Sequence, residues 1–121
     1  MSQVSAPFSS CDFLVYANRT VTIRISIRDN NCNWLLPPFS TGYFAISPYA
    51  GQPFIFDRNT GGSNVRFTSL IAGQWYLDAD ILPTDTMTLT PGAYYYEARL
   101  DFSGGQYELK SGLFLLRSTY I

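Results

Sequence analysis

Three aspartates, Asp78, Asp80 and Asp85, have the spacing that comes closest to an acid–base or calcium site in this sequence. Asp78 and Asp80 are two residues apart, which places both carboxylates on one face of a strand, about 7 Å apart. The sequence around them has neither the glycine-bearing loop of a calcium site nor a neighbouring arginine or lysine that would separate two carboxyl pKa values. We therefore interpret Asp78 and Asp80 as solvated acids on a strand face, and Asp85, between two threonines, as a turn cap.

The sequence contains no histidine, which excludes several classes of enzyme. Ser–His–Asp triads, histidine metal sites and the usual proton shuttle near pH 7 all require an imidazole. The glycine stretches at 61–63 and 103–105 lack the lysine and the following helix of a phosphate-binding loop. These features predict a protein that is not an enzyme and has no cofactor or metal.

The two cysteines, Cys11 and Cys32, are too few for a disulfide scaffold or a thiolate zinc site. We interpret them as two small, half-buried thiols, with a disulfide between them as the alternative.

Apolar residues recur with a period of two, which predicts strands rather than helices. The clearest case is residues 20–28, where Val21, Ile23, Ile25 and Ile27 alternate with polar side chains before the turn residues Asp29–Asn31. Trp75 begins a similar alternation and is expected to anchor the core. The predicted strands are 13–16, 20–28, 42–47, 53–57, 65–70, 74–81, 93–102, 106–110 and 113–118. Such short strands indicate one antiparallel sandwich or small barrel over residues 1–121.

A Leu-x-Pro-Gly turn precedes the strand at 93–102 and is the most specific local pattern in the sequence. Leu89, Pro91, Gly92 and Tyr94 match the tyrosine corner of immunoglobulin-like sandwiches, in which a tyrosine hydroxyl bonds back to the preceding turn. The pattern predicts that Tyr94 clamps this corner. The expected fold is an immunoglobulin-like antiparallel β-sandwich of about seven to nine strands.

The composition is rich in aromatic residues and poor in charge. Aromatic residues make up 17% and charged residues 14% of the chain, against roughly 25% charged in a typical soluble domain. So low a content of charged residues indicates that another chain covers part of the surface. The net charge is −1 and the basic residues are scattered, which argues against nucleic acid as a partner. No signal peptide or membrane span is recognised, so we expect synthesis and assembly in the cytoplasm, without a membrane.

From Leu82 onward the sequence resembles the ending of many small bacteriophage virion proteins. The shared features are the Asp85-Thr86 pair, the Leu-x-Pro-Gly turn at 89–92, the tyrosines at 94–96, a glycine turn, and Ser111-Gly112 before a final apolar strand. In the other half, the strand from Arg19-Thr20 to the turn at Asp29 is similar to the immunoglobulin-like N-terminal domain of phage baseplate upper proteins. The sequence departs from that family in ending near Ile121, so we expect no receptor-binding or attachment module to follow.

This resemblance implies a non-enzymatic structural component of a virion, made in the bacterial host. It would be a capsid decoration or cement protein, or an adaptor in the neck, tail or baseplate, and it would bind larger virion subunits as symmetric copies. Residues 1–12 are expected to be an extended docking arm. The candidate contact residues are Phe8, Phe13, Trp34, Phe39, Tyr120 and Ile121, with burial in the chain's own core as the alternative for each.

A glycan-binding or host-surface module at a tail fibre is the alternative function. Aromatic rings can stack on sugars, and of the three tyrosines at 94–96 only Tyr95 is expected to point away from the core. Core-facing tyrosines are common in strands, and we therefore place this alternative second.

Overall fold

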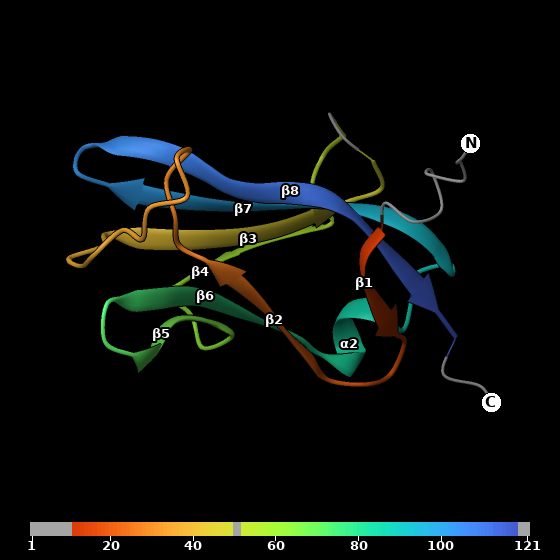
Figure 1. The fold of residues 1–121 in the computed structure, drawn as a ribbon. Coiled ribbons are helices and arrows are strands. Elements are labelled where there is room, and N and C mark those ends of the chain that lie inside the picture. Colours follow the sequence, from red (N-terminus) through yellow and green to blue (C-terminus); the bar gives the residue numbers. More distant parts are fainter. Residues whose placement is uncertain (1–10, 50–51, 119–121) are drawn as a thin grey trace, which may run out of the picture.

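The computed structural model describes residues 11–49 and 52–118, and these residues form two β-sheets packed face to face (Figure 1). One sheet has the strand order β1-β8-β7-β3-β4 and the other has the order β2-β6-β5. The strands are β1 (Cys11–Tyr16), β2 (Val21–Ser26), β3 (Thr41–Ser47), β4 (Phe56–Asn59), β5 (Val65–Ile71), β6 (Gln74–Ile81), β7 (Gly92–Phe102) and β8 (Gly105–Arg117). The predicted all-β sandwich is confirmed.

The order of the strands is that of an immunoglobulin-like sandwich. In that nomenclature β2, β6 and β5 correspond to strands B, E and D, and β8, β7, β3 and β4 to strands G, F, C and C′. Every neighbouring pair is antiparallel except β1 and β8, which run parallel. The eight described strands lie within the predicted number.

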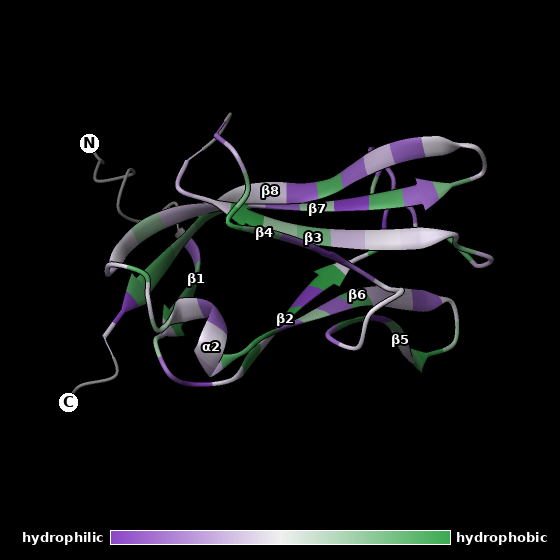
Figure 2. Ribbon diagram, turned by 180° about the vertical axis from the view of Figure 1, so that it is seen from behind, coloured by the Kyte–Doolittle hydropathy of each residue, from purple (hydrophilic) through white to green (hydrophobic). Residues whose placement is uncertain are grey.

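The core lies between the two sheets and is built from the alternating apolar positions. On β2 and β6 the buried apolar residues are Ile23, Ile25, Leu77, Ala79 and Ile81, and the polar residues between them lie on the other face of the sheet, where Asp78 is also buried. Figure 2 shows this alternation as successive purple and green bands along β7. Trp75 is half-buried and packs against the core, as the sequence predicts.

The corner before β7 has the hydrogen bond expected from its sequence. The hydroxyl of Tyr94 donates to the carbonyl oxygen of Thr90 at 2.6 Å, Leu89 packs against the core, and Gly92 has a φ of 154°, which favours glycine. The Tyr94 hydrogen bond therefore connects the start of β7 to the turn that precedes this strand.

The C-terminal strands differ from the prediction. The segments 106–110 and 113–118 are one continuous strand, β8, because Gly112 pairs with Tyr96 instead of breaking the sheet. A Cβ at position 112 would overlap the carboxylate of Asp12, which accepts a hydrogen bond of 2.6 Å from the Tyr96 hydroxyl. Gly112 thus gives Asp12 the space to reach Tyr96.

The turn between β7 and β8 consists of Ser103 and Gly104. Both have positive φ angles, 54° and 82°, which is the geometry of a two-residue type I′ turn. Gly105, which the sequence analysis assigned to the turn, is the first residue of β8. The fourth predicted strand is also displaced, because β4 begins at Phe56 rather than at residue 53.

A short helix, α2 (Pro83–Thr86), connects β6 to the corner before β7. The proline at its first position has no N–H to leave unpaired, which suits the start of a helix. None of the helices in the described part of the chain is long and apolar enough to cross a membrane.

Candidate functional site

The strand-face aspartates form ion pairs across the sheet, and the interpretation of Asp78 as a solvated acid is wrong, whereas Asp80 remains partly exposed. Asp78 is buried and accepts two hydrogen bonds of 2.8 Å from the Arg24 guanidinium. Asp80 accepts hydrogen bonds from Arg66 at 2.9 Å and Thr22 at 2.7 Å. These pairs cannot be predicted from the spacing of the aspartates, because the arginines are their neighbours only through the register of β2 and β5 with β6.

The environment of Asp78 keeps its carboxylate charged. Burial would raise the pKa of Asp78, but the hydrogen bonds from Arg24 and the nearby positive charges outweigh burial and hold this pKa below its ordinary value. Asp78 is therefore an ionised structural partner, whereas a general acid would need a raised pKa.

Asp85 caps α2 and also ties the helix to β4. Its carboxylate accepts a hydrogen bond of 2.7 Å from the backbone N–H of Leu82, which agrees with the predicted turn-capping role. The Arg58 guanidinium pairs with both carboxylate oxygens. Burial would raise the pKa of Asp85, but the Arg58 and backbone hydrogen bonds outweigh it and the pKa is lowered. Within residues 11–49 and 52–118, no three His, Cys, Asp or Glu side chains form a group that could hold a metal ion.

Three connections meet at one end of the sandwich, and we call this region the loop end. They are the β2–β3 connection (residues 27–40), the β5–β6 turn (72–73) and the β7–β8 turn (103–104), at the left in Figure 1. In immunoglobulin-like domains, loops at one end of the sandwich are free to vary in sequence while the sheets hold them in place.

The β2–β3 connection is held by its own hydrogen bonds. One carboxylate oxygen of Asp29 accepts bonds from the backbone N–H groups of Asn31 and Asn33 at 2.8 and 2.9 Å. The backbone bond from Asn33 lowers the pKa of Asp29. The Arg28 guanidinium lies 4.2 Å from the centre of the Trp34 ring. The loop therefore presents a defined surface.

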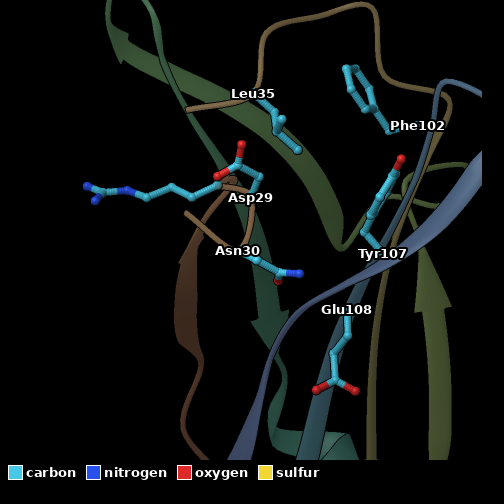
Figure 3. Close-up of a pocket in the computed structure, with 7 residues that line it drawn as sticks. Asp29, Asn30, Leu35, Phe102, Tyr107 and Glu108 are labelled. Carbon is cyan, nitrogen blue, oxygen red and sulfur yellow. The ribbon is translucent and has the colours of Figure 1, made fainter. Parts of the chain in front are cut away.

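The loop end contains two hollows, one on each side of the β2–β3 connection. The first, of about 240 Å³, is walled by Leu35, Phe102 and Tyr107, with polar groups of residues 28–30 and Glu108 at its rim. Figure 3 shows Leu35 facing Phe102 and Tyr107 from the opposite side of this pocket. The second hollow, of about 430 Å³, lies between residues 36–40 and residues 102–104.

Large apolar side chains are exposed at the loop end, and two of them, Leu36 and Tyr107, line the hollows. Leu36 and Tyr107 are each about half exposed, and Leu70 and Ile71 are exposed where β5 reaches the β5–β6 turn. None of these residues is among the contact residues predicted from the sequence. The signal for Leu70 and Ile71 was available, since two adjacent apolar residues break the alternation of β5 where its register with β6 shifts.

The contact residues chosen from the sequence are mostly packed within the chain. Phe13 stacks on Phe114 with ring centres 5.3 Å apart, Phe39 packs against Phe67 at 5.0 Å, and Trp34 meets Tyr76 edge-on at 5.4 Å. All three side chains are half-buried, so each offers only its remaining surface to a partner. Phe8, Tyr120 and Ile121 lie outside the described residues.

Two further sequence interpretations concern the β2–β3 connection and the start of the first strand. Cys32 is an exposed, free thiol with a φ of 66°, so its expected half-burial is wrong. Its interpretation failed because residue 32 lies in the tight loop that Asp29 organises. Of the expected docking arm, residues 1–10 lie outside the described residues, while Cys11 and Asp12 already belong to β1.

The three tyrosines of β7 alternate as expected, with Tyr96 fully buried, Tyr94 stacked on Phe114, and Tyr95 half-buried. Among the tyrosines that the structure describes, Tyr49 and Tyr107 are the most exposed, and they lie in other parts of the molecule. Any stacking platform for a sugar would therefore use these rings in preference to Tyr95.

No protein-family model matches this sequence, and no curated protein sequence is significantly similar to it.

Proposed function

We propose that this protein is a non-enzymatic structural component of a bacteriophage virion. It acts as a capsid decoration or cement protein, or as an adaptor in the neck, tail or baseplate, and binds larger virion subunits as symmetric copies. The observation that carries this proposal is the loop end, where a hydrogen-bonded loop borders two hollows. Exposed Tyr107 lines one hollow and exposed Leu36 the other, while Leu70 and Ile71 are exposed beside the β5–β6 turn at the same end. Exposed apolar side chains around a rigid surface are what a protein partner would cover.

The carboxylates support a structural role over catalysis. Asp78, Asp80 and Asp85 are each neutralised by an arginine of a neighbouring element, and the sequence has no histidine to act as a base near pH 7. These groups hold strands and the helix together, and their lowered pKa values suit that purpose.

A matched pair of substitutions tests whether the loop end is the contact surface. Leu36→Glu places a charge in the loop end, while Met87→Glu places the same charge near the other end, where the native side chain is similarly exposed (55% and 61%). We expect the wild-type chain and Met87→Glu to co-sediment with virion particles that lack the protein, and Leu36→Glu to bind about tenfold more weakly or worse. Equal binding by Leu36→Glu would contradict the assignment of the loop end.

A further inference from the structure

The first hollow of the loop end has apolar walls and a volume that suits a single side chain. Leu35 lies opposite Phe102 and Tyr107, whose ring centres are 6.4 Å apart (Figure 3). The volume is about 240 Å³, which is below the roughly 300–1,000 Å³ of sites that hold drug-sized molecules. The hollow therefore fits one long side chain of a protein partner better than a free small ligand.

Two carboxylates flank this hollow, and neither is neutralised within the described part of the chain. Asp29 and Glu108 lie at opposite ends of it (Figure 3). The hydrogen bonds to both come from neutral groups, which are backbone N–H groups of the loop for Asp29 and the Ser111 hydroxyl, at 2.9 Å, for Glu108. No arginine or lysine of residues 11–49 and 52–118 forms an ion pair with either carboxylate.

The basic residue that lines the hollow, Arg28, directs its charge elsewhere. Its guanidinium lies over the Trp34 ring at 4.2 Å, and Trp34 does not line the hollow. Arg24 makes the same kind of contact with Tyr76 at 5.0 Å. The hollow thus combines aromatic rings in its wall with uncompensated negative charge at its rim, and these are the surroundings that a guanidinium favours.

We propose that this hollow binds an arginine side chain of the larger virion subunit. Its methylene groups would pack between Leu35 and Tyr107, and its guanidinium would lie at the rim with the two carboxylates. Charge complementarity selects a cation, and arginine fits better than lysine because a guanidinium stacks on aromatic rings and is less strongly hydrated than an ammonium. The inference rests on the proposed function for the source of the arginine, whereas the preference of the hollow can be measured without that partner.

The blocked amino acid N-acetyl-arginine methylamide probes the hollow directly. In a titration of the full chain followed by NMR, we expect saturable shifts of the Asn30, Phe102 and Tyr107 amide signals, with a Kd of about 1 mM. N-acetyl-citrulline methylamide has nearly the same shape without the charge and should bind about fivefold more weakly. N-acetyl-lysine methylamide should also bind more weakly than the arginine probe.

A matched pair of charge substitutions tests the rim. Glu108→Gln removes one carboxylate at an exposed position, so we expect it to weaken binding of the arginine probe about threefold and to leave binding of the citrulline probe unchanged. Glu97→Gln removes the same charge from β7 outside the hollow and should leave the Kd of both probes unchanged. Asp29 is kept in both variants because its carboxylate holds the loop.

Several results would overturn the proposal. These are the absence of saturable shifts at about 20 mM arginine probe, shifts located away from the hollow, equal affinity for the arginine and citrulline probes, tighter binding of the lysine probe, and equal affinity of Glu108→Gln and the wild type. Each of them would leave the virion role standing if the chain still binds virion particles. Conversely, probe binding as expected by a chain that is absent from virions would contradict the virion role and leave the arginine site in place.

Discussion

At the scale of single residues, arginine–aspartate pairs fix the relative positions of elements that are distant in the sequence. Arg24 joins β2 to Asp78 of β6, Arg66 joins β5 to Asp80 of β6, and Arg58 joins β4 to Asp85 of α2. Substitution of one partner of such a pair destabilises the fold, because the charge of the other partner is left without compensation.

The pair between Arg58 and Asp85 gives the clearest stability prediction. The Asp85 side chain is almost fully buried, and in Arg58→Met its carboxylate loses the one cationic partner that it has among the described residues. We expect this substitution to lower the free energy of unfolding by about 3 kcal/mol. The control is Arg117→Met, on the exposed end of β8, which should change it by less than about 0.5 kcal/mol. Urea unfolding measures both, and equal effects would show that the buried pair has no special role.

At the scale of elements, the sequence predicts the strands better than it predicts their partners. The alternation of apolar and polar residues in 74–81 correctly predicts both ends of β6, and the Leu-x-Pro-Gly turn correctly predicts the corner at Tyr94. The ion pairs of Asp78 and Asp80 depend on register, which no single strand encodes. The predicted break between strands 106–110 and 113–118 is wrong for a related reason. Gly112 makes room for Asp12, which is about a hundred residues away in the sequence. The exposed loop end depends in the same way on which connections the fold brings together.

The turn between β7 and β8 provides a prediction at this scale. Gly104 has a φ of 82° and no atom near the position that a Cβ would occupy, so Gly104→Ala should cost about 1–2 kcal/mol from backbone strain alone. Gly105 is already in the strand and a Cβ there would make only ordinary contacts with Tyr107. Gly105→Ala should therefore be clearly less destabilising in thermal unfolding. The reverse ranking would mean that Gly105 carries the turn.

At the scale of the whole molecule, many of the few charged residues are paired within the fold. Arg24, Arg58, Arg66 and Arg99 are all engaged in ion pairs with aspartates, and Arg28 lies over the Trp34 ring. The charged groups therefore serve mainly the fold, while apolar side chains remain exposed at the loop end. A protein with this distribution is expected to function with part of its surface covered.

The most direct test of the virion role is the amount of this protein in purified phage particles, measured by quantitative mass spectrometry against the major capsid protein. The proposal predicts a fixed ratio between the two proteins. Roughly hundreds of copies per particle would identify a decoration protein, and a multiple of three or six in roughly the low tens a neck or baseplate component. Absence of the protein from the particles, or a ratio that varies between preparations, would contradict the proposal.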